Sequence, residues 1–454
     1  YTMSRVIRFY RVLRRNPKKS IVLSAILAGG VNYGIDKYEE KQMMRAFCEK
    51  AMVYGECSKP LGEPERHITV LLNPAAKDGK GKVQFERYCA PLLHLAGIKV
   101  ATVRTENEGQ ARDLMEIMEN TNAVVVAGGD GTLGEVLTGL LRRADHSEAA
   151  RKLPLGILPL GNTNTSTAAI WGFRGNPEPR HLAEATMAIV EDIRRPLDVM
   201  EITPLQSVEE GESPSKPVYA ASMLEWGAYR DAVDRKDVYW YWSFLKKYMT
   251  YVFSSYKDIT WDCAAEVEYS VPCSGCSRCR VNIDQENTQR NSAAETPRRW
   301  WMAYIPKAKP VVGRKSDEEK IDYSSIINEE CGVMHKTTFN NICDVTVSTR
   351  NTPQSLDVPS YALSLKTGPA NIGTLEFIKE GWSREWDKVK SYASEINIGE
   401  IILRPSEKKT EKGTDQELNI DSETFEVRPM KIKARPSAVT IFAPADPPFT
   451  AHSG

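Results

Sequence analysis

The first residues in this sequence that point to chemistry are Gly128-Gly129-Asp130-Gly131-Thr132. Three glycines let the main chain approach a ligand closely, and the free N–H groups at the start of a following helix suit phosphate. A carboxylate that faces phosphate repels it unless a metal ion or a transferable proton lies between them. We therefore expect Asp130 to act through magnesium or as a base. The loop matches neither GxxxxGK[ST] nor GxGxxG, and an ordinary strand-to-helix turn is the alternative.

The elements around this loop must present it to a ligand. Residues 123–127 are apolar and β-rich, and Leu133, Val136, Leu137, Leu140 and Leu141 recur at helical spacing, which predicts strand, loop and helix. The neighbouring sequence alternates in the same way, with strands expected at 68–72, 98–104 and 155–158 and helices at 109–119 and 133–143. Such alternation is typical of a doubly wound parallel sheet with helices on both faces.

Three candidate loops directly follow predicted strands: residues 73–76 (NPAA), 128–132 (GGDGT) and 159–164 (PLGNTN). Because the carboxyl ends of parallel strands lie at one edge of a sheet, we expect the loops to converge there and form a nucleotide cleft. Residues 77–82 (KDGKGK) are expected to form a flexible basic loop. Phosphate binding and a plain solvated turn both remain open for it.

From about residue 195 the pattern changes to alternating strands, which predicts an antiparallel β-sandwich. One aromatic helix is expected at 239–256. Core packing is the expectation for its aromatic residues around Trp240 and Phe244, and a membrane-facing lip is the alternative. Residues 270–330 are expected to be an exposed insert, and 404–416 a solvated loop.

Composition limits the classes of function. With 41% hydrophobic and 26% charged residues, the 454-residue chain fits a soluble globular body of two or three domains. Lys plus Arg equals Asp plus Glu, at 60 each, which gives no indication of nucleic-acid binding. Nine cysteines argue against a secreted disulfide scaffold. Solvent-side thiols are the expectation, and a zinc site is the alternative for one group: Cys263, Cys273, Cys276 and Cys279.

The N-terminal segment differs from the rest of the chain. Residues 1–35 contain seven basic residues and no acid, and basic residues recur every three or four positions opposite Val6, Phe9 and Leu13. An acid-free, Arg-rich amphipathic helix is typical of a mitochondrial presequence. The apolar run at 21–31 is too short for an unaided bilayer span and favours an interfacial segment. We expect residues 1–36 to be a targeting or anchor segment and 37–65 a helical connector.

These motifs, in this order, resemble the diacylglycerol kinase catalytic family, a group of lipid kinases that includes sphingosine and ceramide kinases. The likeness covers about residues 67–443, and within the family it is strongest to the mitochondrial acylglycerol kinases, through stretches such as VVVAGGDGTLGEVLTGLLRR, LEWGAYRDA and NIDSETFEV. The chain departs from the family pattern at Gly134, Asn162-Thr163, Thr165 and Ser422. The positions that match are Asn73, Pro74, Thr105, Gly109, Ala111, Gly128 to Thr132, Glu135, Pro159 to Gly161, Asp198, and Asp421 with Glu423.

The resemblance implies an α/β nucleotide domain at 66–194 and a β-sandwich lipid-substrate domain at 195–445, with a tail at 446–454 and the active site in the cleft between the domains. It implies transfer of the γ-phosphate of ATP, with Mg²⁺, to monoacylglycerol or diacylglycerol, giving lysophosphatidic or phosphatidic acid. The residues that it implies for nucleotide binding are Asn73, Pro74, Thr105, Gly128, Gly129, Asp130, Gly131, Thr132, Glu135, Gly161 and Asn162.

Two carboxylates are candidates for the base that activates a lipid hydroxyl. We assign Glu423 as the base and Asp130 as the organiser of metal or phosphate, with the reverse assignment open. Asp231 matches a position that shapes the acceptor pocket in related kinases, and its alternative is a turn former. Asp198 is the second candidate for substrate binding, through orientation of the glycine loop. Its alternative is a strand cap.

Three other functions remain open: a sphingosine or ceramide kinase, an NAD kinase, and a kinase-independent scaffold. The scaffold follows from the resemblance, because acylglycerol kinases are also associated with the carrier protein translocase of the mitochondrial inner membrane. The location implied is that membrane, on the intermembrane-space side. The expected partners are acylglycerol lipids, the membrane and subunits of the translocase, with no nucleic acid.

Overall fold

A computed structural model describes residues 17–56, 65–77, 79–173, 175–205, 216–257, 260–279, 325–352, 358–359, 361–386, 390–406 and 416–444. The chain divides into two compact units. The first unit contains residues 1–133, 151–195 and 440–454, and the second contains 134–150 and 196–439. The predicted α/β plus β fold class is confirmed by a parallel sheet in the first unit and antiparallel sheets in the second.

The first unit is built on four parallel strands: β1 (His67–Leu72), β2 (Lys99–Arg104), β3 (Ala123–Gly128) and β4 (Leu155–Pro159). Their order is β2-β1-β3-β4, with Val70 of β1 beside Thr102 of β2 on one side and Val125 of β3 on the other. Every residue of β3 and β4 is buried. Strands that are buried on both faces read as continuous apolar runs, which is why the sequence predicted them.

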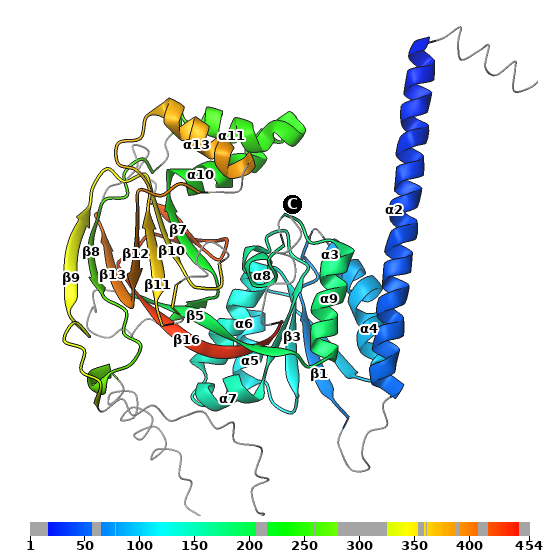
Figure 1. Ribbon diagram of the computed structural model, residues 1–454, viewed down its shortest axis with the longest axis horizontal. Coiled ribbons are helices and arrows are strands. Elements are labelled where there is room, and N and C mark those ends of the chain that lie inside the picture. The colour runs from blue at the N-terminus through cyan, green and yellow to red at the C-terminus, as the bar shows by residue number, and fades with distance from the viewer. Residues whose placement is uncertain are drawn as a thin grey trace, which may run out of the picture. The chain divides into compact units, whose positions relative to one another are not determined.

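The helices of this unit lie on both faces of its sheet. After β1 the chain forms α3 (Lys80–Gln84), a π-helical turn (Phe85–Cys89) and α4 (Ala90–Leu95), and α4 packs against α9 (Pro179–Val190). The opposite face carries α5 (Gln110–Ile117), which follows β2 (Figure 1). After β1, the chain places β2 on one side of β1 and then returns to place β3 on the other side. The strand order therefore reverses between β1 and β3. Ligands of open α/β sheets bind at such a reversal.

One long helix, α2 (Pro17–Glu56), replaces the separate apolar segment and connector that the sequence suggested (Figure 1). Its C-terminal part packs on α4 and α9, with Ala51 buried and Lys50 paired to Glu191 at 2.5 Å. The apolar side chains of its N-terminal part, such as Ile21 and Leu27, are exposed. Across the described ranges, no helix combines the length and the apolar character needed to cross a bilayer. Residues 1–16 of the predicted targeting or anchor segment lie outside the described residues.

The second unit contains a six-stranded antiparallel sheet in the order β12-β11-β10-β7-β14-β15. Its strands are β7 (Met223–Gly227), β10 (Asp344–Ser348), β11 (Leu363–Thr367), β12 (Ser394–Ile398), β14 (Glu417–Ile420) and β15 (Glu423–Glu426). Trp226, Val345 and Leu365 of this sheet share a core with side chains of a second sheet, including Val267 and Ile401. The predicted sandwich is therefore present.

The other side of this core is formed by the strands β16-β13-β8-β9, which are the antiparallel part of a ten-stranded sheet, and β5 pairs with β16 and β6. The bounds are β5 (Arg194–Pro204), β6 (Val218–Ala220), β8 (Ala265–Ser270), β9 (Met334–Phe339), β13 (Glu400–Pro405) and β16 (Met430–Phe442). β16 is one continuous strand, and Ser437 takes a positive φ of 48° within it. Most of the predicted insert, residues 280–324, lies outside the described residues.

The prediction of one aromatic helix at 239–256 is wrong. The segment forms a 3₁₀ stretch (Arg235–Leu245) and a separate helix α11 (Lys246–Ser254), because Ser243 leaves the helical region with φ 50° and ψ −122°. α11 packs against α13 (Thr374–Trp386). Core packing is also wrong for Trp240 and Phe244, which are 75% and 76% exposed. The described residues also form the helices α6 (Asp130–Arg142), α7 (His146–Lys152), α8 (Thr165–Trp171) and α10 (Ala228–Asp234).

Candidate nucleotide-binding and catalytic residues

The first two predicted loops lie side by side where the strand order reverses. Asn73, directly after β1, donates its backbone N–H to the carbonyl of Ala127 in β3 at 3.1 Å. Its side-chain Nδ2 donates to Thr132 Oγ1 at 3.1 Å, and its Oδ1 accepts the N–H of Ala75 at 3.0 Å. Asn73 therefore ties the NPAA turn to the glycine loop, and the prolyl ring of Pro74 fixes φ within that turn.

The third loop crosses the glycine loop at backbone contact. Leu160 donates its N–H to Gly128 O at 2.9 Å, and Asp130 donates its N–H to Thr163 O at 3.2 Å. A Cβ on Gly161 would lie 2.3 Å from Gly129 Cα. Only glycine fits at this crossing. Together, these contacts bring the three predicted loops to one edge of the sheet.

Asp130 is buried, with only 1% of its surface exposed. Its two carboxylate oxygens accept the N–H groups of Thr165, at 2.7 Å, and Ser166, at 3.0 Å, which open helix α8. These donors are free in an isolated helix, and the helix dipole favours a negative charge there. Asp130 thus holds α8 and the third loop against the glycine loop. Its assignment as organiser of metal or phosphate stays a prediction.

The other predicted nucleotide residues surround this edge or continue from it. Thr105 follows β2, is buried and donates its N–H to Leu72 O at 3.1 Å. Gly131 and Thr132 belong to the first turn of α6, and the half-buried Glu135 follows in its second turn. Asn162 is exposed at the tip of the third loop.

The basic stretch at 77–82 differs from the flexible loop that was expected. Gly79, with φ 82°, precedes α3, and this helix takes up Lys80 and Lys82. Burial, with a smaller contribution from Lys80, lowers the pKa of Lys77, which contacts Gln84 Oε1 at 3.4 Å. Phosphate binding by these lysines stays open.

Asn164 was not singled out from the sequence. This buried side chain closes the third loop, because its Oδ1 accepts the N–H of Gly161 at 3.1 Å and its Nδ2 donates to Gly161 O at 2.7 Å. Asparagine that bonds nearby backbone is a known turn former, so the pattern GNTN before a helix carried the signal.

Glu423 begins β15 and is exposed, directly after a two-residue hairpin turn in which Ile420 of β14 pairs with Glu423. Asp421 and Ser422 occupy the turn with positive φ values of 47° and 69°. The Asp421 carboxylate is buried and accepts the N–H groups of Ala221, at 2.6 Å, and of Ser222 and Met223, both at 2.9 Å. Asp421 therefore fixes the turn that positions Glu423.

Arg230 was not singled out from the sequence, yet it fixes the same hairpin. This buried guanidinium donates to Asn419 Oδ1 at 2.8 Å, Thr424 Oγ1 at 3.1 Å and Glu417 Oε2 at 3.1 Å. It also pairs with Asp234 at 2.6 Å. Burial raises the pKa of Asp234, and the positive charge of Arg230 opposes that shift. The fork of Arg230 thus attaches α10 to both strands that flank the turn.

Asp231 and Asp198 make structural contacts within the second unit. Asp231 Oδ2 accepts the N–H of Thr260 at 2.7 Å and its hydroxyl at 2.8 Å, and Asp198 Oδ1 accepts the N–H of Ser437 at 2.8 Å. These contacts match the turn-forming and strand-capping alternatives. A role for either residue in substrate binding stays a prediction.

Ser422 takes a positive φ in the turn between β14 and β15. Both central positions of this two-residue turn need positive φ, which costs an L-residue other than glycine about 1–2 kcal/mol. Ser422→Gly is therefore expected to raise the free energy of unfolding by about 1 kcal/mol, measured by urea denaturation. Ser437→Gly, at the other strained serine within β16, is a matched comparison. A loss of stability in Ser422→Gly would contradict the turn geometry.

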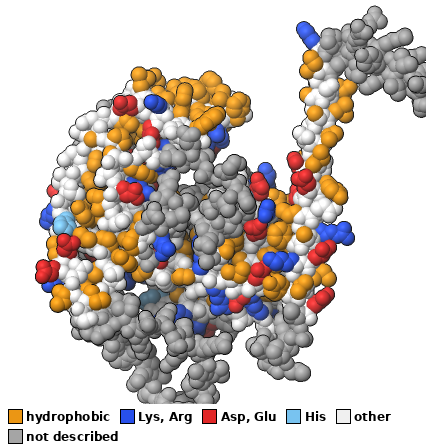
Figure 2. All heavy atoms as spheres, viewed as in Figure 1, with side chains coloured by type: hydrophobic (Ala, Val, Ile, Leu, Met, Phe, Trp, Pro, Cys, Tyr) orange, Lys and Arg blue, Asp and Glu red, His pale blue; other side chains and the backbone are white. Residues whose placement is uncertain are grey.

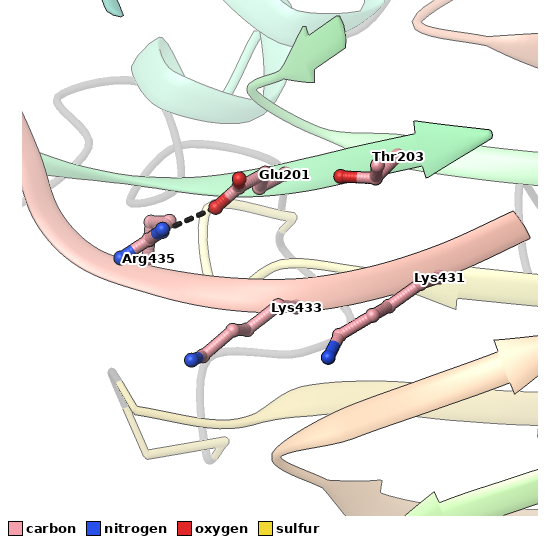
Figure 3. A pocket seen from close by; sticks show the side chains of 5 residues that line it. All are labelled: Glu201, Thr203, Lys431, Lys433 and Arg435. Carbon is pink, nitrogen blue, oxygen red and sulfur yellow. Dashed lines mark hydrogen bonds and ion pairs between the residues drawn. The ribbon is translucent and has the colours of Figure 1, made fainter. Parts of the chain in front are cut away.

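A shallow pocket lies between β5 and β16 in the second unit and is lined by Glu201, Thr203, Lys431, Lys433 and Arg435. Arg435 turns toward Glu201 and pairs with it, and Lys431 and Lys433 extend from the neighbouring part of β16 (Figure 3). None of the predicted site residues lines this pocket.

One of the four cysteines considered as possible zinc ligands, Cys263, does not lie with the other three. Cys263 is buried in the sandwich core, where its Sγ lies 3.6 Å from Trp226 O. Cys273, Cys276 and Cys279 gather instead with Cys331, which precedes β9. The sequence pattern found the three close cysteines but not the partner that β-sheet pairing brings to them.

Comparisons with known proteins cover nearly the whole chain. The family described as "Diacylglycerol kinase catalytic domain" matches residues 67–202, and "Acylglycerol kinase C-terminal" matches 222–447. The Mus musculus protein "Acylglycerol kinase, mitochondrial" is 32% identical over 437 residues, 96% of each chain. The Homo sapiens protein of the same name is 32% identical over 436 residues, also 96% of each. A crystal structure of a putative diacylglycerol kinase from Bacillus anthracis has a TM-score of 0.48 and 14% identity, covering 86% of this chain and 99% of that one.

Proposed function

This chain belongs to the acylglycerol kinase family, and on that basis we propose that it transfers the γ-phosphate of ATP to monoacylglycerol and diacylglycerol. Membership makes it a lipid kinase that uses ATP. The products of the proposed reaction are lysophosphatidic and phosphatidic acid. The observation that carries the proposal is the convergence of the NPAA, GGDGT and PLGNTN loops where the sheet order reverses between β1 and β3.

The phosphate-binding part of the proposed site is mostly main chain. Glycines at 128, 129 and 161 let the loops pack closely against one another, and the start of α6 offers N–H groups and the positive end of a helix dipole. Magnesium enters as part of the MgATP substrate. The buried Asp130 carboxylate, which accepts two N–H groups, does not fit a direct metal ligand in the described arrangement.

Glu423 is the proposed base. Its carboxylate takes the proton of the acceptor hydroxyl as the hydroxyl oxygen bonds to the γ-phosphorus. The bond between that phosphorus and the β,γ-bridging oxygen breaks, and ADP leaves with the bond electrons. Asp421 and Arg230 hold the hairpin that carries Glu423, so they act as positioning residues.

We propose that the exposed aromatic residues of the second unit contact the bilayer that holds the lipid acceptor. Trp240, Tyr241 and Phe244 of the 3₁₀ stretch are exposed, as are Leu375 and Trp386 of α13. Hydrophobic side chains gather over this end of the unit in Figure 2. Tryptophan and tyrosine favour the membrane–water interface, and the adjacent Lys247 suits anionic headgroups.

The double variant Trp240→Ser, Phe244→Ser is expected to lower binding to vesicles and activity on vesicle-embedded diacylglycerol about tenfold or more, because each large apolar side chain contributes about 1.5–3 kcal/mol when buried. Activity on a short-chain, monomeric acylglycerol should stay near wild type. Sedimentation with vesicles and parallel assays of the two acceptors measure this. Ile117→Ser, at an exposed apolar residue of α5, is the control. Equal losses on both acceptors would contradict a membrane role.

The acceptor is tested by offering the purified chain radiolabelled ATP with monoacylglycerol, diacylglycerol, sphingosine, ceramide or NAD in detergent micelles. Labelled lysophosphatidic and phosphatidic acid support the proposal. Preferential labelling of sphingosine or ceramide would favour the sphingolipid alternative. Labelling of NAD instead would contradict both lipid-kinase functions. Support for acylglycerol comes from the match of residues 222–447 to the acylglycerol kinase C-terminal family.

We also propose attachment to the mitochondrial inner membrane on the intermembrane-space side, because the relatives are named mitochondrial and α2 exposes Ile21, Ile26 and Leu27. The same surface suits a scaffold role in the carrier protein translocase. Protease digestion of mitoplasts tests the location, and protection of the chain there would contradict it. Co-purification of translocase subunits with Glu423→Gln tests whether the scaffold role is independent of the kinase.

A further inference from the structure

Four cysteines meet beyond the end of the β8–β9 pair. Cys273, Cys276 and Cys279 follow β8, and Cys331 precedes β9. The last residues that pair are Ser270 and Met334, so Cys273 and Cys331 each lie three positions beyond the ladder. The four Sγ atoms all lie within 4.8 Å of one another. Sheet pairing thus brings together thiols that are far apart in the sequence.

The sulfur spacing fits one metal ion better than disulfides. Cys276 and Cys279 Sγ are 3.8 Å apart, and Cys279 and Cys273 Sγ are 4.0 Å apart. A disulfide needs about 2.05 Å. Four thiolates at about 2.3 Å from a tetrahedral zinc ion lie about 3.8 Å from each other. All four cysteines are free thiols in the structure.

The surrounding main chain supports the thiols as ligands. Cys276 donates its N–H to Cys279 Sγ at 3.2 Å, and Asn328 Nδ2 lies 3.4 Å from Cys273 Sγ. Ser277 N–H bonds Ile326 O at 3.0 Å, which joins the two segments. Gly275 and Gly332 take φ values of 132° and 82° beside Cys276 and Cys331. Hydrogen bonds to sulfur and turns of this kind orient thiolates around a metal.

We propose that Cys273, Cys276, Cys279 and Cys331 bind one structural Zn²⁺ ion. Four sulfur ligands fill a tetrahedral shell and leave no position for a substrate, so the ion has a structural role, separate from the phosphoryl-transfer site. On binding, the thiols lose their protons and the thiolates coordinate the ion. The site fastens the two ends of the long segment between β8 and β9 to each other.

The test uses the full chain, purified under reducing conditions from cells supplied with zinc. Elemental analysis is expected to give one zinc per chain, and Cys276→Ser and Cys331→Ser should each lose most of it. Cys48→Ser, at a half-buried thiol on α2, should keep it. Circular dichroism of each variant checks that the fold survives.

A second measurement does not depend on variants. Cobalt that replaces the zinc in the wild-type chain is expected to give the ligand-field and sulfur-to-cobalt bands of a tetrahedral thiolate site. Wild-type protein without zinc, or with stoichiometric iron, would overturn the proposal. Disulfides among these cysteines in intact-mass analysis, or full zinc retention in Cys331→Ser, would also overturn it.

Discussion

Replacing Gly161 by alanine is expected to lower kcat/KM for phosphoryl transfer at least about 100-fold. The new Cβ would lie 2.3 Å from Gly129 Cα and 2.8 Å from Gly129 N, so the third loop and the glycine loop cannot keep their crossing. Both contacts are with backbone, which cannot rotate away as a flexible side chain can. Displacement of a reacting group by about 1 Å costs roughly 100-fold in rate. Steady-state kinetics with ATP and monoacylglycerol measure the effect.

Gly134→Ala is the matched control for this variant. Gly134 lies in α6, where an added Cβ meets nothing within 4 Å. Alanine is favoured over glycine in a helix by about 1 kcal/mol, so this variant should be active and slightly more stable. Wild-type kinetics in Gly161→Ala would show that the tight crossing does not set the geometry of the site.

Glu423→Gln is expected to lower kcat by about 10² to 10⁴, because a positioned general base contributes about that factor. The side chain is exposed at the start of β15, so the free energy of unfolding should change by no more than about 0.5 kcal/mol. Glutamine keeps the size of the side chain but cannot accept the hydroxyl proton. Single-turnover kinetics with prebound MgATP separate this effect from changes in binding.

Glu426→Gln, at an exposed carboxylate of the same strand, is the control and should keep wild-type kcat. If Glu423→Gln also keeps wild-type kcat while Asp130→Asn loses it with the fold intact, the reverse assignment of base and organiser gains support. Loss of activity in Glu426→Gln as well would indicate that the hairpin tolerates no change, and the assignment of Glu423 would lose its basis.

Local sequence patterns predicted the parallel sheet and its loops. Strand β3, its glycines and the leucines of α6 form one continuous stretch, so their apolar run and helical spacing could be read directly. The meeting of Asn73 with Thr132 followed from parallel strand order, because both residues lie at strand carboxyl ends.

Contacts between distant parts of the chain could not be read in this way. Arg230 reaches Asn419 across 189 positions of sequence, and Cys331 joins cysteines on the other side of a long segment. The sequence spacing does not indicate Asn419 or Cys331 as a partner, because β-sheet pairing alone brings each of them near. The exposure of Trp240 was also hidden, since an aromatic residue reads the same in a core and on a surface.

Hydrogen–deuterium exchange of the full chain, with and without saturating MgATP, tests whether the nucleotide binds at the strand-order reversal. Binding at the strand-order reversal predicts slower exchange in residues 73–77, 128–135 and 160–166, where the three loops and the start of α6 lie. The central part of α5, on the same sheet, should exchange unchanged. If MgATP is bound but these three loops show no protection, or if protection is confined to the second unit, nucleotide binding at the strand-order reversal is contradicted.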